Sequence, residues 1–156
     1  MSLSTKRALM IESLEDRKLM AASVDLNGGV LEIEGTSGND HVQVSTSGNM
    51  LNVFVLNGTT FSVQSFNKHY VEEISFVGNN GDDYFRNDAD IESRAYGGYG
   101  NDTLVGGSHA DSLFGDSGND ILRGNYGNDF IRGGSGNDSL LGDVGHDTRY
   151  GDCGND

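Results

Sequence analysis

The sequence contains no proline and no tryptophan, and it has a single cysteine, Cys153, among 156 residues. A lone cysteine excludes an intramolecular disulfide and a cysteine-based zinc cluster, so neither can stabilise the fold. Basic residues are also few: ten Lys and Arg stand against 24 Asp and Glu, which gives a net charge of -14. A surface of this charge repels nucleic acid and anionic membranes, and its natural partners are cations.

Long apolar runs are lacking as well. The longest one near the N-terminus is Ala8 to Ile11, which is shorter than the core of a secretory signal, about 7 to 15 residues, and a membrane span, about 20. The sequence therefore predicts neither a standard signal peptide nor membrane insertion. Residues 1–23 mix charges with Leu, Met and Ala, which predicts a leader that is helical or disordered; a resemblance given below implies that it is export-related.

Residues 24–96 show the two-residue hydrophobic period of half-buried strands. The alternating residues are Leu31 and Ile33, Val42 and Val44, Leu51, Val53 and Val55, Phe61 and Val63, and Ile74 and Phe76. Glycine pairs and Asn-Gly pairs between them accept positive φ at low steric cost and so form tight turns. This strand-rich region is predicted to be a β meander or the irregular first coils of a β solenoid.

Glycine is abundant and regularly placed: sixteen of the 24 glycines lie in residues 97–156. A nine-residue unit recurs there seven times, the last copy truncated: GGYGNDTLV, GGSHADSLF, GDSGNDILR, GNYGNDFIR, GGSGNDSLL, GDVGHDTRY and GDCGND. GTSGNDHVQ from Gly35 and GNNGDDYFR from Gly78 share this form. A fixed period of this kind predicts stacked structural repeats.

The unit divides into two chemical parts. Its first six positions carry glycine and other residues that tolerate left-handed backbone, which predicts a turn. Its last three positions predict a short strand with one aliphatic side chain pointing inward at position eight. These anchors are Leu104, Leu113, Leu122, Ile131 and Leu140.

Position six is aspartate in every unit: Asp102, Asp111, Asp120, Asp129, Asp138, Asp147 and Asp156. Burying one aliphatic side chain per unit stabilises the fold by much less than the conformational entropy lost in ordering nine residues. Stacking also brings the like-charged aspartates close together. We therefore expect the array without metal to be unstable. Calcium resolves both difficulties, because this hard cation is bound by carboxylate and carbonyl oxygens with a flexible geometry.

The unit resembles the RTX (repeats-in-toxin, haemolysin-type) calcium-binding repeat, strongly over residues 97–156 and weakly over 35–43 and 78–86. The resemblance implies an all-β, right-handed parallel β roll. Two units make one coil, and calcium lies between turns stacked on the same edge. Residues 14–23, LEDRKLMAAS, resemble an N-terminal segment of exported planctomycete proteins.

The resemblance also implies which residues bind the metal. Asp102, Asp120, Asp138 and Asp156 pair across eighteen residues on one edge, and Asp111, Asp129 and Asp147 on the other, which gives about five calcium sites. Asp83 precedes Asp102 by nineteen residues, so it adds a sixth site if a bulge absorbs the extra residue. Turn carbonyls complete the sites, from Gly98, Gly100, Gly107, Gly118, Gly127, Gly134, Gly136, Gly145 and Gly154.

Two units depart from the pattern. His109 and Ala110 replace the usual Gly-Asn before Asp111, which predicts a strained or poorly metallated turn. Arg149 takes the aliphatic place in the sixth unit, so we expect the roll to fray or end near it.

No catalytic residue is predicted. GDSG at Gly115 to Gly118 resembles a serine protease segment, but Ser117 fills a variable repeat position, and no HExxH or GxSxG motif is present. The sequence therefore favours a non-enzymatic, secreted or cell-surface module that folds on binding calcium. The alternative is a non-catalytic C-terminal or fragmentary part of a larger RTX adhesin, toxin or secreted hydrolase. The sequence identifies no protein or carbohydrate partner.

Overall fold

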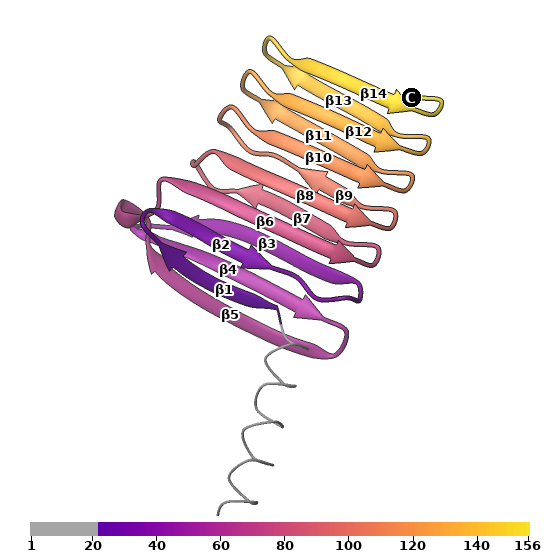
Figure 1. The fold of residues 1–156 in the computed structure, drawn as a ribbon. Coiled ribbons are helices and arrows are strands. Elements are labelled where there is room, and N and C mark those ends of the chain that lie inside the picture. Colours follow the sequence, from indigo (N-terminus) through magenta and orange to yellow (C-terminus); the bar gives the residue numbers. More distant parts are fainter. Residues whose placement is uncertain (1–21) are drawn as a thin grey trace, which may run out of the picture.

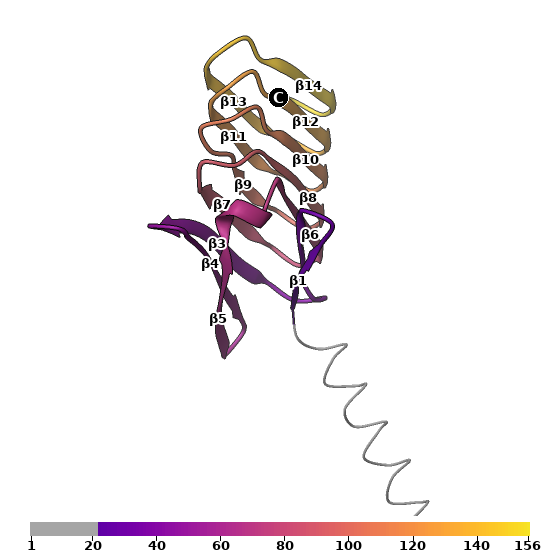
Figure 2. The ribbon, with the colours of Figure 1, turned by 90° about the vertical axis from the view of Figure 1, so that its left-hand side faces the viewer.

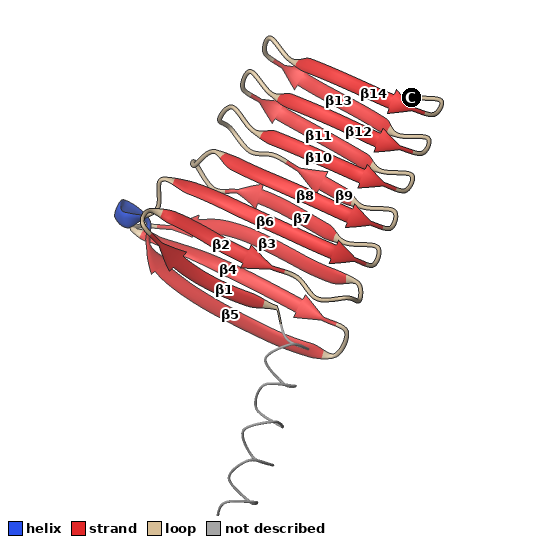
Figure 3. Ribbon diagram, viewed as in Figure 1, coloured by secondary structure: helices blue, strands red, loops and turns tan. Residues whose placement is uncertain are grey.

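A computed structural model describes residues 22–156 as two facing seven-stranded sheets stacked along one axis (Figures 1 and 3). Sheet A contains, in spatial order, β1 (Ser23–Asn27), β2 (Val30–Glu34), β6 (Glu73–Asn80), β8 (Ser93–Tyr99), β10 (Ser112–Ser117), β12 (Phe130–Ser135) and β14 (Thr148–Cys153). Sheet B contains β13 (Ser139–Val144), β11 (Ile121–Tyr126), β9 (Thr103–Val105), β7 (Tyr84–Asp88), β3 (Asp40–Ser47), β4 (Met50–Asn57) and β5 (Thr60–Asn67). The predicted leader falls mostly on residues 1–21, which lie outside the described residues.

From β6 onward the chain alternates between the two sheets, so that two repeat units make one coil (Figure 2). Strands of successive coils pair in parallel: Ser112 of β10 lies opposite Phe130 of β12, eighteen residues further on. Strand β11 pairs in parallel with β9 and β13 on the facing sheet. The predicted fold class, an all-β parallel solenoid of the β-roll type, is confirmed.

The strand-rich region combines both arrangements that the sequence allowed. Strand β2 pairs in parallel with β6, and β3 with β7, which continues the solenoid toward the N-terminus. Strands β4 and β5 then add to β3 as an antiparallel meander, and β1 pairs antiparallel with β2. The short 3-10 helix η1 (Lys68–Tyr70) returns the chain from β5 to the coil.

Strand β5 differs from its sequence pattern in one respect. Phe61 and Val63 alternate with polar residues as in a half-buried strand, yet they are 58% and 53% exposed. The reason is position: β5 forms the outer edge of sheet B. The alternation thus identified a strand but not a covered face.

The strands of the array are also longer than the three residues expected. Strands β10 to β14 each contain six residues, because positions one to three of the next unit continue the strand. Asp116 and Ser117 of β10, for example, pair in register with Gly98 and Tyr99 of β8. Only β9 keeps the three-residue length.

The core is a double column of inward side chains between the sheets. Leu104, Leu113, Leu122 and Ile131 are completely buried, and Leu140 is partly buried against them, as their place in the repeat predicted. Larger residues fill the N-terminal end, where Phe76 and Phe85 stack with ring centroids 4.9 Å apart. Arg149 follows Ile131 in the column but is exposed, although β14 continues past it. Within residues 22–156, no helix has the length and apolarity needed to span a membrane.

Candidate metal centre

The turns between the sheets form two straight edges. We call the turns from sheet A to sheet B the first edge and the turns from sheet B to sheet A the second edge. Position-six residues line each edge in order: Asp40, Asp83, Asp102, Asp120, Asp138 and Asp156 on the first, and Ser93, Asp111, Asp129 and Asp147 on the second. Most of them are buried, Asp102, Asp111 and Asp120 to 1% exposure, so carboxylates line the inside of each edge.

A ladder of hydrogen bonds joins the aspartates of each edge. The backbone N–H of one aspartate donates to Oδ1 of the aspartate one coil later, at 2.8 Å for Asp102 to Asp120 and 2.9 Å for Asp120 to Asp138. The same bond joins all the other pairs that eighteen-residue spacing predicted: Asp111 to Asp129, Asp129 to Asp147, and Asp138 to Asp156. The structure therefore brings the predicted pairs together.

Asp83 belongs to the first ladder despite its nineteen-residue spacing. Its N–H donates to Asp102 Oδ1 at 2.8 Å. The register explains how: β7 pairs with β9 at an offset of nineteen, whereas Ser93 contacts Asp111 at an offset of eighteen. The extra residue therefore lies in the connection after β7, on the second edge, and leaves the first edge undisturbed.

Each carboxylate in this ladder has a second oxygen that points into the turn. Oδ2 has no hydrogen-bond partner in Asp83, Asp102, Asp120, Asp129 and Asp138, although these atoms are buried. A buried carboxylate oxygen without a partner is costly, so each one calls for a donor or a cation.

Backbone carbonyls lie beside these oxygens. A Cβ placed on Gly115 would meet both Asp120 Oδ2 and the carbonyl oxygen of Gly133 in the next coil, the latter at 2.6 Å. Only a glycine at position one leaves this space open. Carboxylate and carbonyl oxygens that converge on one small space are the ligands that calcium prefers. Because no group of three or more His, Cys, Asp or Glu side chains gathers in residues 22–156, a metal here depends on the carbonyls.

Burial raises the pKa of these carboxyls. It raises the pKa of Asp83 to about 7 and the pKa values of Asp102, Asp120 and Asp129 to about 6. The low-dielectric surroundings disfavour the charged form, the ladder N–H groups oppose the shift, and neighbouring carboxylates add to it. The ionised carboxylates therefore destabilise the folded array, and a bound cation would offset this loss of stability.

The turns with partnerless Oδ2 atoms share one backbone conformation. Positions two and four both have positive φ, as at Asp116 (72°) and Gly118 (139°). The same pair of angles occurs in all seven turns that end in Asp83, Asp102, Asp120, Asp129, Asp138, Asp147 and Asp156. We call these the open turns. Among the glycines predicted to supply carbonyls, Gly98 and Gly134 lie at position two and Gly100, Gly118, Gly127, Gly136, Gly145 and Gly154 at position four of these turns.

In the open turns, position four is sterically restricted to glycine. A Cβ on Gly118 would overlap the carbonyl oxygen of Gly100, one coil earlier. We therefore expect Gly118→Ala to lower the free energy of unfolding in calcium. Backbone strain alone should cost about 1 to 3 kcal/mol, and the disturbed stacking of the turns should add to it. Thermal unfolding of both proteins measures the difference. Gly38→Ala is the control, since Gly38 also lies at position four but has no neighbour closer than 4.0 Å and no positive φ; an equal loss in both variants would contradict the steric argument.

A second ladder runs outside the first. The N–H of Asn119 donates to Asn101 Oδ1 at 2.9 Å, and the N–H of Asn137 donates to Asn119 Oδ1 at 2.8 Å. Asn155 and His146 continue the same pattern with Asn137 and Asn128. The position-five residues therefore fix the spacing of successive turns.

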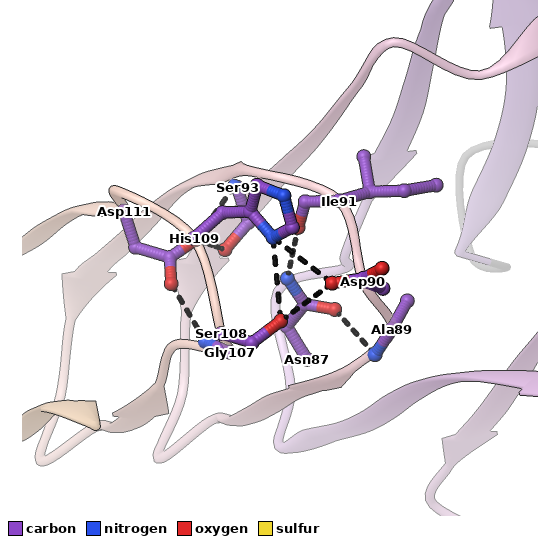
Figure 4. Close-up of polar contacts among 9 residues, drawn as sticks. All are labelled: Asn87, Ala89, Asp90, Ile91, Ser93, Gly107, Ser108, His109 and Asp111. Atoms are coloured by element: carbon purple, nitrogen blue, oxygen red, sulfur yellow. Dashed lines mark hydrogen bonds and ion pairs between the residues drawn. The ribbon is translucent and has the colours of Figure 1, made fainter. Parts of the chain in front are cut away.

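The turn that ends in Asp111 has a different conformation. Neither Gly107 nor His109 has positive φ, and the Gly107 N–H donates to Asp111 Oδ2 at 2.6 Å. Asp111 Oδ1 accepts from the N–H and Oγ of Ser93 at 2.6 and 2.7 Å (Figure 4). Gly107 was predicted to supply a metal-binding carbonyl; in the structure its N–H closes this turn, and its carbonyl oxygen accepts from the N–H of Tyr126 at 3.2 Å.

Ser108, His109 and Asp90 lie together beside this turn (Figure 4). Ser108 Oγ and Asp90 Oδ1 both lie 3.3 Å from His109 Nδ1, and 2.9 Å from each other. A Ser-His-Asp relay needs two different ring nitrogens, one for the serine and one for the carboxylate. The cluster therefore lacks the geometry that activates a serine nucleophile.

Sequence reasoning missed two members of the ladders. Asp40 N–H donates to Asp83 Oδ1 at 2.8 Å across 43 residues, and Ser93 replaces an aspartate one coil before Asp111. The resemblance of GTSGNDHVQ to the repeat was a signal for Asp40. No signal marked Ser93, because the residues before it do not follow the repeat.

The fold and its edges define a class: a β solenoid whose stacked turns carry inward carboxylates beside glycine carbonyls. Residues 94–122, 114–148 and 123–156 match the family described as RTX calcium-binding nonapeptide repeat (4 copies). Residues 94–156 therefore match RTX calcium-binding repeats, as the resemblance implied. Searches of curated proteins and of solved structures gave no significant match.

Proposed function

We propose that the protein binds calcium between the stacked open turns and that this binding drives the folding of the array. The observation that carries the proposal is the row of buried, partnerless Oδ2 atoms in Asp83, Asp102, Asp120, Asp129 and Asp138. Calcium would satisfy these atoms and neutralise the charge that burial concentrates. Binding free energy then becomes folding free energy.

The open turns form the sites in pairs. Asp83 with Asp102, Asp102 with Asp120, Asp120 with Asp138 and Asp138 with Asp156 would hold four ions on the first edge, and Asp129 with Asp147 one on the second. Carbonyls of the glycine-rich turns complete the coordination. The expected number is about five ions.

Coupling to calcium suits a secreted or cell-surface module without catalytic activity. Residues 97–156 carry ten Asp against three Arg, a net charge of -7, so the chain repels itself where free calcium is scarce. The repeat array would stay unfolded and exportable inside the cell and fold in the millimolar calcium outside, a range in which extracellular calcium modules bind.

Calorimetric titration of the chelator-treated protein with calcium tests this proposal. We expect about five ions per chain and a simultaneous gain of β signal in circular dichroism. Magnesium is the matched control, because it demands a strict octahedral shell and should produce little of either change. Absence of calcium binding, or binding without a gain of β structure, would sink the proposal.

A further inference from the structure

The aspartate turns fall into two structural classes. In the seven open turns, positions two and four have positive φ. In the turns that end in Asp40 and Asp111, neither position has positive φ, and the position-two N–H donates to the aspartate Oδ2 at 2.6 Å, from Thr36 and Gly107 respectively. We call these two the closed turns.

The closed turns hold the first aspartate on each edge. Asp40 precedes Asp83 on the first edge, and Asp111 follows Ser93 on the second. Asp40 keeps one partnerless oxygen, Oδ1, which no earlier aspartate N–H reaches. Asp111 has partners at both oxygens: two donors from Ser93 and one from Gly107. Of the two closed turns, only that of Asp111 therefore satisfies both carboxylate oxygens with hydrogen bonds.

Three hydrogen bonds stabilise the buried Asp111 carboxylate, as we propose that a cation stabilises the other carboxylates. Hydrogen bonds to a buried carboxylate are charge-assisted and roughly twice as strong as neutral ones. The Gly107 N–H also directs a positive dipole at Oδ2, the oxygen that is bare in the open turns. A cation approaching that oxygen would meet this dipole instead of a lone pair.

We infer that the Asp111 turn is a metal-free clasp, which ties β8 to β10 without calcium and gives the calcium-dependent coils a preformed end on which to stack. The N-terminal coils bury larger side chains than the array: Phe76 and Phe85 are completely buried, whereas β8 to β12 bury one aliphatic side chain each, from Ala95 to Ile131. The coils on the N-terminal side of the clasp therefore gain more stability from burial, and those after it depend more on metal.

The substitutions in this unit explain the closed conformation. Open turns place glycine at position four with φ between 116° and 158°, where a non-glycine residue is strained. His109 at position four disfavours that conformation and leaves the closed one. The unit predicted to have a strained or poorly metallated turn would then be the metal-independent starting point of the array.

Two variants of the full chain, Asp111→Asn and Asp120→Asn, test the clasp by calcium calorimetry. Asp120 lies between two open turns, so its loss should remove about two ions, whereas loss of Asp111 should leave the number of ions unchanged. A fall of about one ion in Asp111→Asn would overturn the clasp. The inference relies on the proposed function only for this comparison: if the unmodified protein bound no calcium, the proposed function would fail, and the next experiment would still test the clasp.

Hydrogen exchange of the unmodified protein in chelator provides that test, because it measures the protection of each strand without metal and needs no variant to fold. We expect amides of β8 and the start of β10 to remain protected while those of β12 to β14 exchange rapidly, since only the latter depend on metal. Added calcium should then protect β12 to β14. Equal, rapid exchange in β8 and β14 in chelator would overturn the clasp.

Discussion

In chelator, acidification from about pH 8 to about pH 5 is expected to raise the thermal unfolding midpoint of the protein. Burial raises the pKa of Asp83 to about 7 and those of Asp102, Asp120 and Asp129 to about 6. The ordinary pKa of an unfolded aspartate is 3.8, so between about pH 7 and about pH 4 the folded state binds more protons than the unfolded state. Stability therefore increases as the pH falls through about 7 and levels off near about 4.

Calcium should reverse the sign of this dependence. A coordinating carboxylate must be deprotonated, so protons compete with the metal, and the calcium-loaded protein should lose stability over the same interval in which the metal-free protein gains it. The two melting profiles should therefore converge as the pH falls. A protein stabilised by calcium through surface charge alone would show no such convergence, because exposed carboxylates titrate near their ordinary pKa.

Melting curves from about pH 8 to about pH 5, with calcium and with chelator, measure both slopes. Asp83→Asn is the informative variant, because it removes the ladder carboxyl with the highest pKa. In chelator, the rise of the unfolding midpoint on acidification should be smaller in this variant and should begin at a lower pH. Asp25→Asn is the matched control, since Asp25 is exposed and lies outside the ladders. A midpoint in chelator that falls on acidification would contradict the buried-carboxylate account.

The repeat predicted much of this site because its chemistry is local. Aspartate at position six and an aliphatic residue at position eight recur every nine residues, and the structure buries both. Stacking of identical units then fixes the eighteen-residue pairing, since a parallel ladder places equivalent residues side by side. Asp102 and Asp120 were predictable as neighbours for this reason.

Features that depend on more distant residues were not predictable. Asp40 reaches Asp83 only because β4 and β5 fold out of the coil as a meander, which leaves β3 beside β7. The nineteen-residue spacing of Asp83 called for a bulge without locating it, and the structure has the extra residue in the connection after β7, on the second edge. In both cases the position was decided by tertiary pairing, which the local pattern does not encode.

The closed turn of Asp111 shows a different limit. The sequence marked His109 as a departure, and glycine preference explained why the open turn would be strained there. It did not show that the Gly107 N–H would take over the role of the metal, because the direction of a backbone N–H follows from φ and ψ of the whole turn. Absence of a consensus residue predicted a defect, whereas the structure contains an alternative arrangement.

Leu122→Ala is expected to cause a large loss of stability in the array. Leu122 is completely buried and pairs in register with Leu104 and Leu140 on the neighbouring coils. Removing a buried leucine side chain costs about 2 to 5 kcal/mol, and little other apolar material lies near enough to fill the space. The effect should be large in calcium, where the array is folded.

Ile121→Ala is the matched control because it removes an aliphatic side chain one residue away. Ile121 points outward from the same strand and is 49% exposed, so its loss should change the unfolding free energy by about 0.5 kcal/mol or less. Chemical denaturation of both variants in saturating calcium measures the difference. Similar losses in the two variants would mean that the sheets do not enclose the column of position-eight side chains.

The same pair of variants tests whether the metal sites and the core act as one unit. If calcium binds only the folded array, destabilisation of that array by Leu122→Ala must weaken apparent calcium binding. The overall constant for loading about five ions should fall by about tenfold for each 1.4 kcal/mol lost, a loss that is shared among the ions. Leu122 is not a ligand, so no direct effect on coordination is expected. Calorimetry should therefore show unchanged stoichiometry with weaker affinity for Leu122→Ala and unchanged affinity for Ile121→Ala. An affinity that stays constant while the core is destabilised would show that the sites exist before calcium arrives, and coupled folding would be wrong.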